Sequence, residues 1–226
     1  MKNLGNDHVN LDQKAYNQLK SMILDQKLKS GSKIYQEKLA IDLGISRTPL
    51  VNALKKLEQE QLISAVPRKG FYVRDISKEE MVNIFELREV LEGLAARRAS
   101  LRISDNQIKK LNDLYKGLET AGAGGNIENY AKADRLFHHF MIKLGGDDLM
   151  FNILETYSVI ASSYLVKYRG GLVRSPKETL PEHLAIIEAI INRNPEKAEQ
   201  AARNHFKRSR EKLLKDFEEE SKNGSL

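Results

Sequence analysis

The sequence changes character near residue 75. Before that point, apolar residues at helical spacing are followed by two short β-type runs, whereas the remainder is helical in pattern almost throughout. Turn-forming segments divide this later part near residues 102–104, 120–126, 145–147, 170–175 and 192–195. We therefore predict a mainly α protein, with one domain at residues 1–75 and an all-α bundle of about six helices at residues 76–226.

The first domain is predicted to contain three helices and a β-hairpin. Apolar residues recur at helical spacing over residues 11–28, and a second short helix is expected from Gln36 to Leu43. A third helix begins at Ser46, whose hydroxyl we expect to cap the first turn. Two β-type runs at residues 62–66 and 71–74 flank a Pro- and Gly-containing turn. Three helices and a hairpin in this order make a winged helix-turn-helix.

The positive charge of the chain is concentrated in this first domain. The whole chain has a formal net charge of +6, of which residues 1–75 carry +5 and the remainder +1. Such asymmetry indicates a module that binds a polyanion, attached to a nearly neutral domain. A basic, solvated surface with no partner is the alternative that charge alone leaves open.

Composition excludes several classes of site. The chain has no cysteine, so disulfides, thiolate zinc fingers, iron–sulfur clusters and cysteine nucleophiles are absent, and a metal site would need its five histidines and its carboxylates. The opening segment is polar, and no stretch approaches the roughly 18 uninterrupted apolar residues of a membrane span. We therefore expect a soluble, cytoplasmic protein with no membrane partner.

The third helix has the two faces of a DNA-recognition helix. Its apolar residues fall on one face and are expected to pack inward: Leu50, Ala53, Leu54 and Leu57. Arg47 on the exposed surface can pair with the O6 and N7 edge of guanine, and Asn52 with the N6 and N7 edge of adenine. The second helix of such a unit enters the major groove, with the hairpin behind it as a wing.

The remaining exposed basic residues suit the DNA backbone. Lys55 and Lys56 on the third helix, and Arg68 and Lys69 in the hairpin turn, are candidates for phosphate contacts. Gly70 has no Cβ, so the wing can approach the duplex closely. Each residue alone could be ordinary polar surface, but the combination predicts DNA binding by Ser46, Arg47, Thr48, Asn52, Lys55, Arg68, Lys69 and Gly70.

Residues 10–75 resemble the winged helix of GntR-type bacterial transcription regulators. The resemblance is carried by Leu39-Ala40, Leu43-Gly44-Ile45-Ser46-Arg47-Thr48-Pro49, Ala53-Leu54, Leu57, Leu62-Ile63 and Arg68-Lys69-Gly70-Phe71-Tyr72-Val73. Two departures matter. Family members usually have Arg and Glu where this chain has Val51 and Asn52, and Gly where it has Gln61. The missing Arg implies an operator that differs from the usual one.

A candidate metal site lies in the second domain. Asp134 and His138 are four residues apart in a helical segment, so they lie on one face about a turn apart and could chelate one ion. If the bundle brings His183 and His205 to the same place, the set suits Zn²⁺ best, with Ni²⁺, Mn²⁺ or Fe²⁺ as alternatives. Solvated or hydrogen-bonded histidines are the other interpretation. His139 points away from His138 and is expected in the core or behind the ligands.

Residues 77–215 resemble the C-terminal ligand-binding bundle of the FadR subfamily of GntR regulators. The resemblance is carried by Arg88, Leu91-Glu92, Ala95-Ala96, Asp134-Arg135-Leu136-Phe137-His138, Glu182-His183, Ala189-Ile190 and Ala198 through Ala201-Ala202 to His205. It implies a divalent ion bound by Asp134, His138, His183 and His205, which helps to hold a small carboxylate effector. It also suggests Arg88 as an anion partner of the effector, although a salt bridge on the helix surface or between helices is the alternative.

These features together predict a DNA-binding transcription regulator rather than an enzyme. Regulators of this family are most often repressors that act as homodimers on inverted-repeat operators in double-stranded DNA, and a bound carboxylate would control operator binding. The runner-up is a metal-dependent hydrolase or lyase that uses the Asp/His site, because an ion with an open position can activate water. A third possibility is a purely structural metal bundle that assembles other proteins and has no sequence-selective DNA binding.

Overall fold

The computed structural model describes residues 5–223 and divides the chain into two compact units. One contains Met1–Ile76 together with Val159–Lys167, and the other contains Ser77–Ser158 and Tyr168–Leu226. The division after Ile76 lies at the sequence change described above. The grouping of Val159–Lys167 with the first unit was not predicted, because local patterns along a helix do not reveal which distant residues it contacts.

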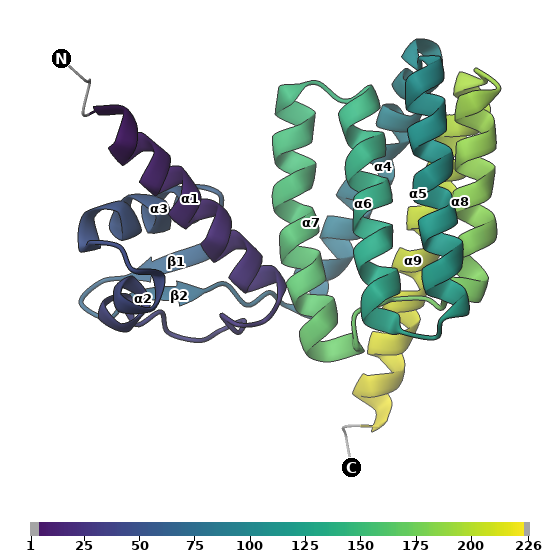
Figure 1. The fold of residues 1–226 in the computed structure, drawn as a ribbon. Helices are drawn as coiled ribbons and strands as arrows, with labels where there is room; N and C mark the ends of the chain where they lie inside the picture. The colour runs from purple at the N-terminus through teal and green to yellow at the C-terminus, as the bar shows by residue number, and fades with distance from the viewer. Residues whose placement is uncertain (1–4, 224–226) are drawn as a thin grey trace. The chain divides into compact units, whose positions relative to one another are not determined.

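The first unit is a helix-turn-helix with a hairpin (Figure 1), as predicted. Its elements are α1 (Gly5–Leu24), α2 (Gln36–Leu43), α3 (Arg47–Gln59), β1 (Ile63–Val66) and β2 (Gly70–Val73). The strands are antiparallel, with Ile63 opposite Val73 and Val66 opposite Gly70. The inward face of α3 is buried through Leu50, Ala53, Leu54 and Leu57, and Leu19 and Ile23 of α1 belong to the same buried set.

The expected capping hydrogen bond of Ser46 is absent. Ser46 is the N-cap residue of α3, but its side chain makes no capping hydrogen bond. An N-cap side chain normally accepts from the N–H of the second or third helical residue. The third residue of α3 is Pro49, which has no N–H to donate. Ser46 therefore marks the start of the helix without its hydroxyl stabilising it there.

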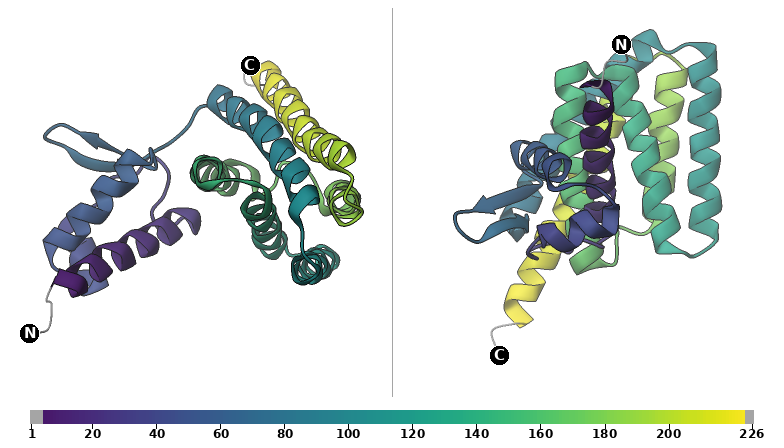
Figure 2. Two further views of the ribbon diagram at one scale, coloured as in Figure 1. Left: turned by 90° about the horizontal axis from the view of Figure 1, so that it is seen from above. Right: turned by 60° about the vertical axis from the view of Figure 1, so that its left-hand side comes forward.

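Six helices follow in the described chain, in agreement with the about six expected from the sequence, and they lie side by side (Figures 1 and 2). Apart from Val159–Lys167 they belong to the second unit. They are α4 (Lys78–Arg102), α5 (Asp105–Ala123), α6 (Ile127–Gly145), α7 (Asp148–Arg169), α8 (Pro176–Ile191) and α9 (Pro195–Asn223). α4 contacts α6, α8 and α9, so these four helices can direct side chains to one place. The core between them includes Phe137, Met141, Ile186, Ile190 and Ala202.

The close crossing of α4 and α6 depends on a glycine. A Cβ built on Gly145 of α6 would lie 1.8 Å from the carbonyl oxygen of Ala95 in α4. No side chain fits at that distance, so only glycine allows the two backbones to approach this closely. The crossing fixes α6, which carries Asp134 and His138, against α4, which carries Arg88 and Glu92.

One helix within residues 5–223, α7, is long and apolar enough to cross a membrane by length and composition alone. The apolar window in this helix is 39% buried. Core helices of water-soluble bundles pass the same test, so α7 by itself carries no argument for a membrane.

The end of α3 contains a strained residue. The N–H of Gln61 donates to the carbonyl oxygen of Glu58, and the N–H of Leu62 donates to the carbonyl oxygen of Leu57. This is the hydrogen-bond pattern of an α-helix that ends in one residue of left-handed backbone conformation. Gln61 has a φ of 60°, a conformation that favours glycine. Gly44 ends α2 in the same way, with a φ of 62°.

We expect Gln61→Gly to stabilise the first unit by about 1 kcal/mol, because it removes the steric cost of the left-handed conformation. The Gln61 side chain is exposed, so no packing is lost. Unfolding in urea, followed by circular dichroism, measures the change. The matched control is Gly44→Gln, which should destabilise by a similar amount. A neutral or destabilising Gln61→Gly would contradict this account.

Candidate metal centre and nucleic-acid interface

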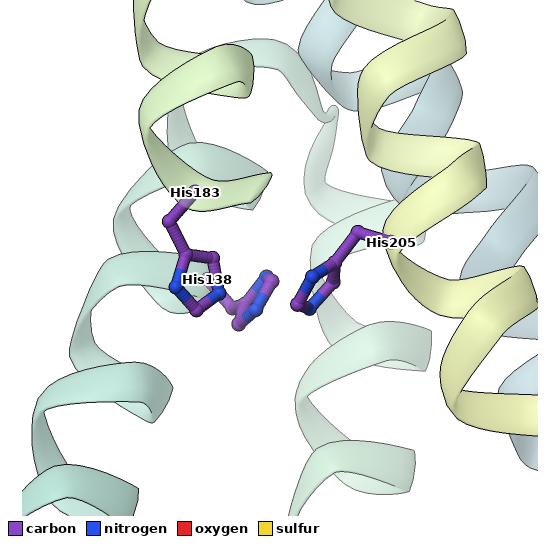
Figure 3. Close-up of side chains that lie close together, drawn as sticks. All are labelled: His138, His183 and His205. Carbon is purple, nitrogen blue, oxygen red and sulfur yellow. The ribbon is translucent and has the colours of Figure 1, made fainter. Parts of the chain in front are cut away.

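Three buried imidazoles meet inside the second unit (Figure 3). His138 comes from α6, His183 from α8 and His205 from α9, and their side chains point toward one another. Their exposed fractions are 2%, 0% and 5%. One nitrogen from each ring lies within 4.8 Å of the others. The packing of three helices thus brings together residues that are up to 67 positions apart in the sequence.

Asp134 adds a carboxylate to the cluster. It lies one turn before His138 on α6, and its Oδ1 is 3.3 Å from Nε2 of His183 and 3.8 Å from Nε2 of His138. Its side chain is 27% exposed, so it is the member of the set that solvent reaches most easily. The structure therefore brings together all four residues that the sequence suggested as ligands.

Several nitrogen atoms of the cluster lack hydrogen-bond partners. Within the described part of the chain, Nε2 of His138 and both ring nitrogens of His183 are buried and accept or donate no hydrogen bond. Buried polar atoms are nearly always paired, so unpaired atoms that face one another need an explanation. An ion bound between the rings would take Nε2 of His138 and one of the two nitrogens of His183, and one carboxylate with three imidazoles is a donor set that suits divalent transition metals.

Burial also favours the protonation states that a metal ion needs. It lowers the pKa of His205 to about 3 and lowers the pKa of His183, so both rings are neutral near pH 7. Burial would raise the pKa of Asp134, but the surrounding imidazoles outweigh it and hold the pKa of that carboxyl well below its usual range. Neutral imidazoles and an ionised carboxylate are the forms that bind metals.

Glu92, which sequence reasoning did not assign a role, orients His138. Glu92 is fully buried, and its Oε2 lies 2.7 Å from Nδ1 of His138. Burial alone would raise the pKa of Glu92. Arg88 and His138 lower it by more than burial raises it, so the pKa of Glu92 lies below its ordinary value. An ionised carboxylate only accepts, so Nδ1 carries the hydrogen and the lone pair of His138 is on Nε2, toward Asp134.

Arg88 lies behind the cluster rather than in it. Its Nε donates to Oε1 of Glu92 at 2.7 Å, one turn along α4, and its guanidinium lies 4.5 Å from the ring centroid of Phe206. This salt bridge within α4 corresponds to the alternative considered for Arg88. The charge of Arg88 is thus already matched by Glu92, and Arg88 acts on His138 through that carboxylate.

Glu182 plays the same part for His205, and sequence reasoning missed it too. Its Oε2 lies 2.9 Å from Nδ1 of His205. Arg174 donates to Oε1 at 2.8 Å, and Arg208 donates to the same oxygen at 2.7 Å. The position of Glu182 directly before His183 was visible in the sequence, but adjacent residues on a helix point in different directions, so the contact with His205 was not.

The expectation for His139 was wrong. This residue is neither in the core nor behind the ligands, since its side chain is 43% exposed. Its Nδ1 lies 3.0 Å from Oε2 of Glu155, and its ring packs against Phe151 of α7. The angular argument that separated it from His138 was correct, but α6 presents that side to a partly open surface.

The first unit presents the residues expected to contact DNA. Ser46, Arg47, Thr48, Asn52, Lys55, Arg68 and Lys69 are exposed, and Gly70 is partly buried. Among the residues that the structure describes, Arg47, Lys55, Arg68 and Lys69 form no ion pair, so their charges are available to a polyanion. Gly70 has a φ of 95°, so the hairpin turn itself requires glycine there, apart from any contact with DNA.

Lys56 differs from the other basic residues. Its Nζ donates to Oε1 of Gln13 at 3.0 Å and lies 4.1 Å from the ring centroid of Tyr16, both on α1. These contacts hold Lys56 against the first unit. It is therefore less available for a phosphate than Lys55, for which the sequence gave the same expectation.

Comparison with known proteins decides the family. The model of bacterial regulatory proteins of the gntR family matches residues 11–73, and the FCD domain model matches residues 83–208. The chain belongs to the GntR family of bacterial transcription regulators, with an FCD C-terminal domain. It is therefore a DNA-binding regulator. The alternative interpretation, a metal-dependent hydrolase or lyase, is wrong, because the relatives of this chain are transcription regulators.

The relatives align over nearly the whole chain. An uncharacterized HTH-type transcriptional regulator of Bacillus subtilis, YdhC, is 28% identical over 92% of this chain and 93% of its own length. The Escherichia coli repressor RspR is 24% identical over 93% and 92%, and the E. coli regulator McbR is 30% identical over 82% and 96%. The solved structure of E. coli McbR/YncC covers 92% of this chain and 98% of its own, with a TM-score of 0.77 at 21% identity. That structural similarity shows the fold.

Sequence-selective binding to duplex DNA should depend on Arg47. We expect Arg47→Ala to cost about 1–3 kcal/mol of binding free energy on the preferred site, because it would remove the guanine contact that the sequence predicts for Arg47. Lys69→Ala is the matched control: it removes the same charge from the wing and should weaken all sequences similarly, with a smaller salt dependence. Fluorescence anisotropy with preferred and scrambled duplexes measures both. If Arg47→Ala left the preference for the selected duplex intact, Arg47 would not read a base.

Proposed function

We propose that this regulator is a repressor whose DNA binding is controlled by a small carboxylate bound at a metal site. In this proposal residues 1–75 bind an inverted-repeat operator, and residues 76–226 bind the metal and effector and form a homodimer. The observation that carries the proposal is the buried set of unpaired imidazole nitrogens beside Asp134. The relative RspR, named a repressor, supports the direction of control.

Asp134, His138, His183 and His205 would hold the metal ion. Three nitrogens and one oxygen suit Zn²⁺ best, with Ni²⁺, Mn²⁺ or Fe²⁺ as alternatives. When bound, the ion supplies positive charge and open positions for an oxygen ligand. Glu92 and Glu182 keep His138 and His205 in one tautomer and orientation, which is how carboxylates behind metal-bound imidazoles usually act.

The charges around the site favour an anionic effector. With neutral imidazoles, the nearby carboxylates and guanidinium groups balance one another: Asp134, Glu92 and Glu182 against Arg88, Arg174 and Arg208. A divalent ion would add two positive charges with no counter-charge. A small dicarboxylate, tricarboxylate or hydroxy acid would neutralise them, and the exposed edge of Asp134 is the side from which it could approach.

Arg174 and Arg208 connect the site to other segments of the bundle. Arg174, in the connection between α7 and α8, bonds to Glu182 and to the carbonyl oxygen of His205, and Arg208 extends the contact along α9. A ligand that changes the position of His205 would therefore act on three segments together. It can affect DNA binding only if two arrangements of the dimer hold it unequally.

The first test is metal content. We expect the purified protein to retain about one transition metal ion per chain after mild dialysis, measured by inductively coupled plasma mass spectrometry. His183→Ala should lose most of it, because a fully buried ligand is removed. His139→Ala is the matched control and should keep the metal, since His139 lies outside the cluster. A protein that binds no Zn²⁺, Ni²⁺, Mn²⁺ or Fe²⁺ on titration would remove the proposed site.

The second test measures whether a carboxylate bound in the second unit changes the DNA affinity of the first. With succinate, malate and citrate as probes, an active ligand should change operator affinity at least tenfold, about 1.4 kcal/mol of coupling. Calorimetry should show that operator DNA changes the affinity for that ligand by the same factor. His138→Ala should keep operator binding and lose the response. If a tightly bound carboxylate left operator affinity unchanged at every salt concentration, the metal would be structural.

A further inference from the structure

One edge of α3 is tied to α1 by a row of polar contacts. Nδ2 of Asn52 donates to Oδ2 of Asp12 at 3.0 Å, and Lys56 one turn later contacts Gln13 and Tyr16. A further turn on, Glu60 accepts a hydrogen bond from the Tyr16 hydroxyl at 2.6 Å. α1 therefore fixes Asn52 and Lys56 on α3 and Glu60 directly after it, and Asn52 is the one nearest the start of the helix.

Asn52 lies on the side of α3 that faces away from the core. Leu50, Ala53, Leu54 and Leu57 define the buried side, and at about 100° per residue Asn52 lies opposite to them. Thr48 and Lys55 share this exposed side with it. A side chain in this position reaches base edges if α3 enters the major groove.

The contact with Asp12 fixes which way the Asn52 amide faces. An amide has a donor end and an acceptor end of nearly the same shape, so an unrestrained asparagine can turn either toward a base. A carboxylate only accepts, so it attracts the Nδ2 end and repels the Oδ1 end. Asp12 thus holds one of the two Nδ2 hydrogens and leaves the other hydrogen and Oδ1 free.

The free atoms match one base. One N–H donor beside one carbonyl acceptor is the pair that adenine takes at N7 and N6 in the major groove. We propose that Asp12, on the helix before the helix-turn-helix, is a specificity-determining residue that positions Asn52 to read adenine. This inference rests on the proposed operator binding by residues 1–75, and it adds a residue outside the recognition helix.

The experiment compares base preferences of the full-length protein. Each base pair of the operator half-site is substituted in turn, and competition binding gives the preference at each position for the parent, Asn52→Ala and Asp12→Ala. The parent should prefer A·T at one position by about tenfold or more. Asn52→Ala should lose that preference, and Asp12→Ala should reduce it to a few-fold at the same position while leaving the others unchanged.

Two further variants separate positioning from charge and from general structure. Asp42→Ala removes the same charge from an exposed position on α2, so it should change affinity for all sequences together. In the variant with both Asp12→Ala and Asn52→Ala, the preference at that position should equal that of Asn52→Ala alone, because Asp12 acts through Asn52. A merely structural role for Asp12 would lower affinity at all positions without this dependence.

Each result decides the inference. Full preference at the Asn52 position in Asp12→Ala would overturn it, as would an Asn52→Ala protein with unchanged preference at every position. Either result could occur while Arg47→Ala still lost selectivity, in which case operator binding would stand and only the role of Asp12 would fall. If no duplex were preferred by the parent protein, the proposed function itself would fail.

Discussion

Buried charge in the middle of the bundle places the strongest constraint on the second unit. Taking a carboxylate out of water costs several kcal/mol unless charged or hydrogen-bonding partners surround it. Glu92 is fully buried and satisfies this requirement with Arg88 and His138 at once. Removing either partner would leave a buried charge exposed to apolar neighbours, so the identities of these residues depend on one another.

Close helix packing makes that arrangement possible. Gly145 lets α6 approach the backbone of α4 at Ala95, and a Cβ on Gly93 of α4 would lie 2.6 Å from Cγ of Arg203 on α9. With so little space around α4, side chains at the centre have few alternative rotamers. The positions of the imidazoles are therefore set by the backbone as well as by their hydrogen bonds, so the geometry of the cluster does not depend on a bound ligand.

The sequence predicted the elements better than it predicted their contacts. Periodicity was enough to find α2, α3 and the hairpin, and the spacing of Asp134 and His138 was enough to put them on one helix face. The meeting of His183 and His205 with that face depends on the order of helices in space, which periodicity does not contain and only resemblance supplied. Glu92 was missed because a glutamate at helical spacing is usually solvated. The sequence predicted a capping hydrogen bond at Ser46, and this was wrong because Pro49 leaves the third helical position without an N–H to donate.

The two units use the same physical device for different purposes. An imidazole and an amide each have two ends, and either can face a ligand unless something distinguishes them. Glu92, Glu182 and Asp12 are carboxylates, which only accept, so each binds the donor end of its neighbour. In the second unit, the acceptor nitrogens of His138 and His205 therefore face the cluster. In the first unit, the side-chain amide of Asn52 is held in one orientation. The difference is burial: Glu92 is shielded from water, whereas the contact between Asp12 and Asn52 lies at the surface, where water competes for both groups and weakens the preference for one orientation.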